Sequence, residues 1–302
     1  MNIKKILWAS DGSKESDSAL RYATFLAEKF EAEILSIFVS EIHFPITSLF
    51  PIPEDAIMDI VEKTEKRFEN RFIRVSKRLK EKGINSTFKI VRDGAVEGII
   101  KAVRSNGCDL IVMGKHGQGF VERAVIGSNT AKVLRKSPVP VLSVKGKGRK
   151  SISKIENILV PVDVSDDTES AILSSLELAE IFNASVTLLY VFWLDENVYD
   201  IPPSLVKKLM EKSHKKLDRM ANTAKKKFFK PKKRTNLNIS ISTEVIHGVS
   251  PGLAIRYYAN RNKIDFIMMN THGRKGIKRI VLGSEAEKVI REAPCPVLVF
   301  RP

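Results

Sequence analysis

Three glycines and the hydroxyl residue after them are the part of this chain best suited to binding an anion. They lie in Asp109–Thr130, DLIVMGKHGQGFVERAVIGSNT, as Gly, two residues, Gly, nine residues, Gly and then Ser. Glycine lets backbone N–H groups approach a ligand closely, and a helix amino terminus adds about half a positive charge. The flanks predict a buried strand before the glycines and a helix after them, with Ser128 or Asn129 as its N-cap. The pattern favours a phosphate-binding turn, and a merely flexible turn is the alternative.

The same stretch occurs again half a chain later. Asp265–Ala286 reads DFIMMNTHGRKGIKRIVLGSEA, and its Gly273 and Gly283 each lie 156 residues after their counterparts. An internal repeat of this length indicates two copies of one domain, each of ordinary domain size. We therefore expect one domain at residues 1–145 and a second at residues 153–302, joined by a short polar linker.

Segments typical of strands and helices alternate in both copies. In the first copy we expect strands at Ile3–Ser10, Glu33–Val39, Thr87–Val91, Asp109–Met113 and Pro138–Val144, and helices at Ser18–Phe30, Glu54–Lys82, Val96–Ser105 and up to Lys136. In the second we expect strands at Asn157–Val162, Ser185–Val191, Ile239–Ile246, Asp265–Met269 and Pro296–Phe300, and helices at Asp166–Phe182 and Ser204–Phe229. This order predicts an α/β fold with a doubly wound, Rossmann-like, five-stranded parallel sheet in each domain. Such sheets bind ligands at the carboxyl ends of their strands.

The net charge of +16, from 51 basic and 35 acidic residues, raises the question of nucleic acid. Most lysines are spread along helical segments, which is typical of solvated helix faces. The one dense cluster, Lys225–Arg234, interleaves basic and aromatic residues, as some single-strand binders do. No nucleic-acid fold signature accompanies it. We therefore expect a solvated helix end and loop, with an anionic partner as the alternative and nucleic acid not the expected partner.

A membrane is not an expected partner either, and neither is a metal ion held by the cysteines. No run approaches the ~18 apolar residues of a membrane helix, and Asp11 ends the apolar start of the chain too early for a signal peptide. We expect a cytoplasmic protein. Cys108 and Cys295 lie at non-equivalent places in the two copies, which favours buried thiols over a metal set or a disulfide.

At this level of detail the chain resembles the universal stress protein family. ATP-binding members of that family carry the same spacing, which this chain meets with Gly114, Gly117, Gly127 and Ser128. The opening ASDGS and the closing PVPVL of the first copy are also similar to the family, as are GSEAEKV and APCPVL of the second. The resemblance covers nearly the whole chain and implies a tandem universal stress protein.

The resemblance implies an adenine-nucleotide site in the first domain. Asp11 would face the adenosine, although an Asp that only caps a turn is the alternative. The backbone near the second and third glycines would hold the phosphates, with Mg²⁺ on them, and a solvated or capping imidazole is the alternative for His116. The implied nucleotide-binding residues are Ala9, Ser10, Asp11, Val39, Met113, Gly114, Lys115, His116, Gly117, Gly127, Ser128, Asn129 and Thr130.

The second copy departs from the family pattern on its phosphate side. The residues that correspond are Pro161, Asp163, Val191, Met269, Asn270, Gly273, Gly283 and Ser284. Asn270 replaces the first glycine, and Glu285 follows where we expect phosphates to lie. A carboxylate near phosphates weakens binding unless a cation lies between them. We therefore expect a complete ATP site in the first domain and a degenerate or AMP-type site in the second.

Three classes of function compete. The resemblance implies a ligand-responsive stress or signalling protein that binds ATP, ADP or AMP. An adenylating enzyme of the PP-loop type would need paired glycines after the first strand, and a dehydrogenase would need its glycines there rather than after the fourth. We expect no catalytic residues and at most weak ATP hydrolysis, with a slow ATPase or an anionic-partner module as the alternatives.

The last strand of each copy suggests how the copies associate. In single-copy relatives of the family the last strand pairs across a dimer. We therefore expect Pro138–Val144 and Pro294–Phe300 to pair within one chain, the Pro-x-Pro sequence suiting a sheet edge with few donors. Two chains could then form a homodimer.

Overall fold

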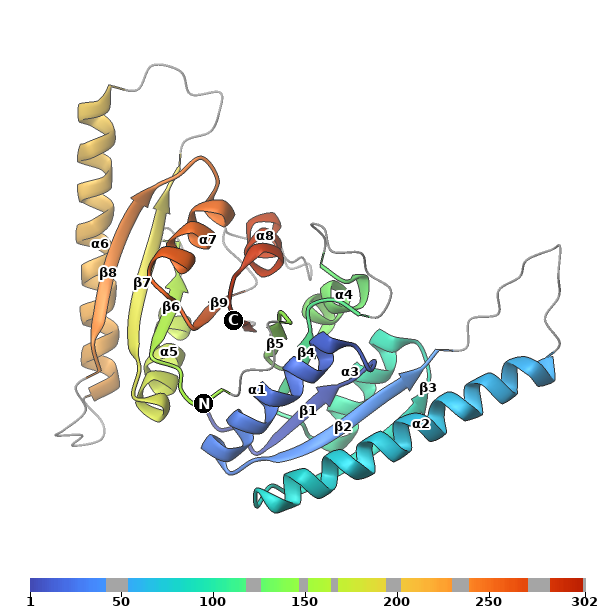
Figure 1. Ribbon diagram of the computed structural model, residues 1–302. Helices are drawn as coiled ribbons and strands as arrows, with labels where there is room; N and C mark the ends of the chain where they lie inside the picture. The colour runs from blue at the N-terminus through green and yellow to red at the C-terminus, as the bar shows by residue number, and fades with distance from the viewer. Residues whose placement is uncertain are drawn as a thin grey trace, which may run out of the picture. The chain divides into compact units, whose positions relative to one another are not determined.

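The computed structural model describes residues 1–41, 54–117, 126–146, 152–163, 168–193, 202–229, 239–270 and 283–300. Nearly all described residues up to 146 form one compact unit, and those from 152 onward belong to a second. Each unit is an α/β domain built on a parallel sheet (Figure 1). The predicted fold class is confirmed. Most of the predicted linker, residues 147–151, and the end of the basic cluster, residues 230–234, lie outside the described residues.

The first domain follows the predicted alternation of strands and helices. Its elements are β1 (Lys5–Ala9), α1 (Lys14–Phe30), β2 (Glu33–Ser40), α2 (Glu54–Glu81), β3 (Ser86–Arg92), α3 (Ala95–Asn106), β4 (Leu110–Gly114), α4 (Ser128–Lys136) and β5 (Val141–Val144). The strands lie in the order β3-β2-β1-β4-β5, and every neighbouring pair is parallel. The chain order therefore reverses between β1 and β4, and a doubly wound sheet binds ligands beside such a reversal.

The second domain repeats this arrangement. Its elements are β6 (Asn157–Pro161), α5 (Glu169–Phe182), β7 (Ser185–Phe192), α6 (Pro203–Phe229), β8 (Ile241–His247), α7 (Pro251–Arg261), β9 (Phe266–Asn270), α8 (Ser284–Glu292) and β10 (Val297–Phe300). The order β10-β9-β6-β7-β8 is again parallel throughout. The sequence analysis named no helix between Gly248 and the strand at Phe266, where the structure has α7.

The core of each domain is the apolar sheet with helices packed on it. Along β1 and β4 nearly every side chain is buried, as expected for a central parallel strand. In the first domain α2 lies along β2 and β3 (Figure 1). It contributes Phe68, which stacks on Phe38 with ring centroids 3.6 Å apart, and the fully buried Phe72.

Several element boundaries differ from the predicted ones for local reasons. Helix α1 begins at Lys14 because the hydroxyl of Ser13 accepts a hydrogen bond from the Ser16 N–H at 3.1 Å, as an N-cap does. Strands β5 and β10 begin only after their Pro-x-Pro sequences, since proline cannot donate to a ladder. The expectation that these prolines lie in the edge strands was therefore wrong.

The two cysteines are free and buried, as predicted. Burial raises the pKa of the Cys108 thiol to about 11, so it stays protonated at neutral pH.

Candidate functional site

The carboxyl ends of β1, β2 and β4 bring the first group of predicted site residues together. Ala9 lies between Ile37 and Met113 in the strand register, and Gly114 ends β4. Val39 lies near the carboxyl end of β2, and its side chain packs on Gly98 of α3, where a Cβ would come within 2.9 Å of it. These residues share the sheet edge next to the reversal of strand order.

The turn after β1 places Asp11 in front of this edge. The Asp11 carboxylate accepts a hydrogen bond from the Ser13 N–H at 3.0 Å, so the Asp does cap its turn. Gly12 has a φ of 81°, a conformation that favours glycine. Ser10 is buried, and its hydroxyl lies 3.4 Å from that of Ser16. Asp11 is thus held in place by its own turn.

The second glycine of the motif lies directly against Asp11. A Cβ on Gly117 would come within 2.8 Å of Asp11 Oδ2, closer than side chains approach. The tertiary structure therefore joins the two halves of the predicted site, the Asp after β1 and the glycine loop after β4. Any larger residue at this position would require the Asp11 carboxylate to shift.

The first glycine has a different reason to be glycine. A Cβ on Gly114 would lie 3.0 Å from the backbone of Glu15 and from the Ser16 nitrogen. The first turn of α1 thus needs a residue without a side chain at the end of β4. This packing requirement accounts for Gly114 without a ligand.

The third glycine closes the loop. The Gly127 N–H donates to the Lys115 carbonyl at 3.0 Å, and a Cβ there would lie 3.1 Å from the same oxygen. Gly127 itself is the N-cap of α4 and has no side-chain cap, so the prediction of Ser128 or Asn129 as N-cap was wrong. The buried Thr130 hydroxyl donates to the Gly114 carbonyl at 3.0 Å and so ties α4 to the loop.

The exposed Ser128 and the half-buried Asn129 start α4, and their N–H groups are among those that a helix leaves without intrahelical partners. Lys115 is buried, and its own N–H donates to the Val144 carbonyl at 2.8 Å. Hydrogen bonds of both the Lys115 N–H and the Lys115 carbonyl thereby fix this backbone between β5 and the start of α4.

Sequence reasoning assigned no role to Glu15, which the structure places at this loop. Its carboxylate accepts a hydrogen bond from the His116 N–H at 2.5 Å and lies 3.1 Å from His116 Nδ1. The His116 imidazole is therefore paired with a carboxylate of the same chain. This arrangement is closer to the capping imidazole, one of the alternatives named above, than to a solvated one. No sequence motif links the two residues, which lie 101 positions apart.

The second domain repeats the turn that follows the first strand. The Val162 N–H donates to the Leu189 carbonyl at 2.9 Å, as the Ser10 N–H does to Ile37 in the first domain. Pro161 ends β6 with Asp163 two residues later, and Asn270 ends β9. Val191 and Met269 are buried, Gly283 is the N-cap of α8, and Ser284 is exposed. Gly273 lies outside the described residues.

Glu285 is bonded to the start of α7. Its carboxylate accepts a hydrogen bond from the Gly252 N–H at 2.8 Å, contacts Ser250 Oγ at 3.2 Å and pairs with Lys288 at 2.7 Å. Burial raises the pKa of Glu285, but these partners outweigh it, and the pKa lies below its ordinary value. The charge caps the amino terminus of α7 and is compensated there. Glu285 therefore has a structural role that the sequence analysis did not name, and its effect on phosphates stays a prediction.

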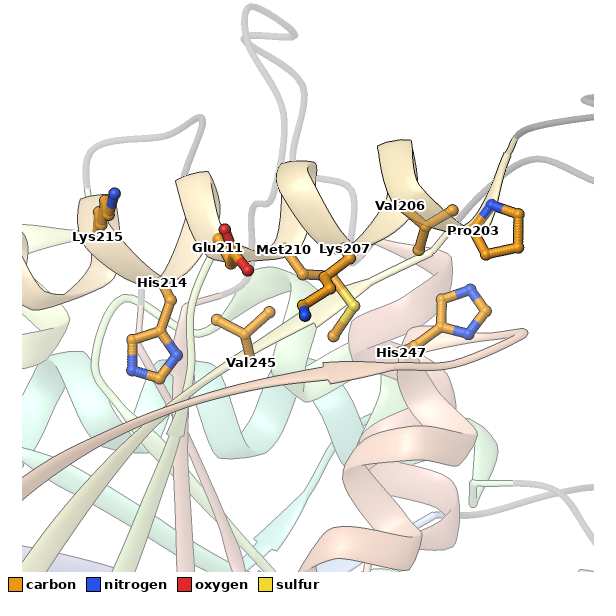
Figure 2. Close-up of a pocket in the computed structure, with 9 residues that line it drawn as sticks. All are labelled: Pro203, Val206, Lys207, Met210, Glu211, His214, Lys215, Val245 and His247. Atoms are coloured by element: carbon orange, nitrogen blue, oxygen red, sulfur yellow. The ribbon is translucent and has the colours of Figure 1, made fainter.

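The structure also shows a groove that sequence reasoning missed, between α6 and β8 of the second domain (Figure 2). It has a volume of about 660 Å³ and an apolar floor that includes Val206, Met210 and Val245, with His214 and His247 beside it. The residues of α6 that face it recur at every fourth position. The available signal was this helical spacing of Val206, Met210 and His214 along α6.

Comparisons with known proteins agree with the two-domain pattern. The model of the universal stress protein family matches residues 2–145 and again residues 154–301. The chain is 24% identical to universal stress protein Slr1230 of Synechocystis, over 99% of this chain and 100% of the relative. It is 32% identical to universal stress protein MJ0531 of Methanocaldococcus jannaschii, over 48% of this chain and 82% of the relative.

The fold is shared with a solved structure of similar length. The crystal structure of a universal stress protein from Archaeoglobus fulgidus superposes with a TM-score of 0.65 at 22% identity, covering 98% of this chain and 96% of that one. Among the helices that the structure describes, none is long and apolar enough to span a membrane. Since the family model matches nearly the whole chain in two copies, this protein belongs to the universal stress protein family and carries its domain in tandem.

Proposed function

We propose that the first domain binds ATP, with Mg²⁺ on its phosphates, at the carboxyl edge of β1, β2 and β4. The observation that carries the proposal is the contact between Gly117 and Asp11, where a Cβ would stand 2.8 Å from the carboxylate. This contact leaves backbone rather than side chain facing the ligand side of the loop. The exposed start of α4 adds N–H groups and the positive end of a helix dipole.

The protein's role on this proposal is that of a cytoplasmic nucleotide receptor in stress or signalling. Bound nucleotide would fix the glycine loop against α1 and α4, and that change would be what a partner recognises. ATP hydrolysis would be weak at most, because the polar groups beside the loop are engaged in positioning it. The Thr130 hydroxyl donates to Gly114, and Glu15 pairs with His116.

We further propose that the two sites are unequal, the second being degenerate or of the AMP type. In the first domain Gly114 accommodates the first turn of α1, whereas Asn270 stands at that place in the second. The equivalents of Lys14 and Glu15, residues 166 and 167, lie outside the described residues, so the proposal rests on Asn270. The adenosine side is repeated in the second domain.

The strand orders support a proposal for association. β5 and β10 are the terminal strands of their own sheets, next to β4 and β9. We propose that these two edges pair within the chain and that such units form homodimers. Cross-links between cysteines introduced in β5 and β10 would test the intramolecular pairing, and sedimentation equilibrium would give the number of chains.

Thermal unfolding of the full chain with and without ATP tests the nucleotide site. Saturating ligand should raise the melting temperature, and Gly117→Val should abolish the rise because its side chain would fill the place beside Asp11. Gly107→Asn is the matched control, since Gly107 has a φ of 61° that Asn tolerates and no atoms within 4 Å of its Cβ position. An unchanged rise in the Gly117 variant would refute the site.

A hydrolysis assay separates the receptor from the slow ATPase. The receptor should release phosphate at a rate close to that of ATP alone in buffer. Rapid turnover that Gly117→Val abolishes would instead identify an enzyme.

A further inference from the structure

One carboxylate in the first domain is bonded to the loop that we propose for phosphate binding. Glu15 is the second residue of α1, and its Oε2 accepts the His116 N–H at 2.5 Å. Both carboxylate oxygens lie near His116 Nδ1, at 3.1 and 3.2 Å. His116 lies between the first two glycines of the motif. An internal anion therefore already occupies an N–H group of this loop.

The position of Glu15 is fixed by packing on two sides. A Cβ on Gly146, after β5, would lie 2.9 Å from Glu15 Cγ, and one on Gly114 would lie 3.0 Å from Glu15 Cβ. The Glu15 side chain is 21% exposed. Glycines at both places let the side chain reach the loop, which a freely solvated glutamate would not require.

A favourable interaction with the α1 dipole does not explain this placement. Glu15 and Asp17 are both acidic residues in the first turn of α1, and both gain from the dipole. The Asp17 carboxylate pairs with Arg71 of α2, whereas that of Glu15 is directed at the glycine loop. The two residues therefore form a natural matched pair of the same charge.

We infer that Glu15 determines which adenine nucleotide the first domain prefers, by opposing ligands in proportion to their phosphate charge. This inference rests on the proposed nucleotide site. A Cβ on Gly127 would lie 3.5 Å from His116 Cα, so His116 stands beside the place where the two glycine turns converge. Phosphates held by those turns lie next to the Glu15 carboxylate. ATP carries about four negative charges and AMP about two, so ATP is opposed more strongly.

Calorimetric titration of the full chain with ATP, ADP and AMP at pH 8, without Mg²⁺, tests the inference. Glu15→Gln should lower the Kd for ATP about tenfold and that for AMP about threefold or less, with ADP between them. Binding that Gly117→Val removes is assigned to the first domain. Asp17→Asn is the matched control, because it removes the same charge two residues away and should leave the ATP-to-AMP ratio unchanged.

Two further variants separate charge from shape. Glu15→Ala also removes the charge and must shift the ratio in the same direction, while Glu15→Asp keeps the charge and must keep the ratio near that of the unmodified chain. The melting temperature without nucleotide shows which variants are folded. With Mg²⁺ added, the effect of Glu15→Gln should shrink, because the cation compensates the phosphates.

The inference is overturned if Glu15→Gln weakens ATP binding, which would make Glu15 a residue that positions the loop for phosphate. It is also overturned if the ATP-to-AMP ratio does not change, or if Asp17→Asn changes it equally. If the unmodified chain binds no nucleotide, the proposed function itself fails. That result is distinct from a chain that binds nucleotide with an unchanged ratio.

Discussion

The outer layers of the two domains differ more than their sheets do. In the first domain aromatic rings lie between α2 and β3, and the ring centroids of Phe72 and Phe88 are 5.8 Å apart. Arg92, at the end of β3, donates two hydrogen bonds to Glu65 of α2, at 2.7 and 2.8 Å. In the second domain Thr243 stands at the register position of Phe88, and the groove of Figure 2 lies farther along β8, beside Val245 and His247.

The two long helices also differ in charge. α2 carries eight basic and seven acidic residues, whereas α6 carries nine basic and two acidic ones. Several charges of α2 are paired, as Lys63 is with Asp59 and Lys66 with Glu69. The comparison teaches that the outer helix and the outer strand beneath it diverge together. β3 and β8 are only partly buried, whereas a central strand such as β4 is buried throughout.

The largest expected effect comes from removing one of the aromatic rings between α2 and β3 of the first domain. Phe72→Ala should destabilise that domain by about 3–5 kcal/mol, because a fully buried ring is lost and a cavity remains. Guanidinium denaturation measures the loss. Ile73→Ala is the control on the neighbouring residue, which is 51% exposed and should cost far less. Equal losses from both substitutions would show that burial of the Phe72 ring does not matter.

The next effect distinguishes the two nucleotide sites. We expect calorimetric titration with Mg²⁺-ATP to give about one tight site per chain, the second site binding at least about tenfold more weakly, a difference of about 1.4 kcal/mol. Asn270→Gly should bring the second site closer to the first, because it removes the side chain at the place where Gly114 packs on α1. Two equal tight sites in the unmodified chain would show that Asn270 does not matter.

A smaller effect concerns Glu285. Glu285→Ala should destabilise the second domain by about 1 kcal/mol, because the Gly252 N–H loses its cap in a partly exposed place. The folded-state pKa is lowered, so this contribution is present above the unfolded value of about 4.3 and lost as the pH falls through the folded pKa. Denaturation at pH 7 and pH 3 measures it. The number of ATP molecules bound per chain should stay the same, and an increase would show that Glu285 repels the phosphates.

The smallest effect concerns the exposed ion pair between Arg92 and Glu65 of the first domain. The hydrogen bond from Arg92 is the main cause that lowers the pKa of Glu65. Arg92→Ala should therefore reduce stability slightly at pH 7 and less at pH 3, because protonation of Glu65 as the pH falls removes the ion pair. Comparing the denaturation midpoints of the variant and the unmodified chain at the two pH values tests this. A loss of the same size at pH 3 would assign the effect to packing.

The repeat, the alternation of strands and helices, and the spacing of the glycines were sufficient to predict the fold class and the family. Apolar runs of strand length and helical periodicity are local properties, and they survive in both copies. The helix α7 was missed because its apolar residues are interrupted, and its start at Pro251 follows a turn-like Gly-Val-Ser sequence.

Only the tertiary structure decided what the polar residues near the motif do. Gly114 is explained by the backbone of α1, and Glu285 turns to α7 rather than to a ligand. Glu15 meets His116 across 101 residues of sequence. The sequence by itself determined which segments form helices and which form strands, since that choice depends on neighbouring residues. Side-chain partners depend on which elements the sheet order brings together, and no local pattern contains that information.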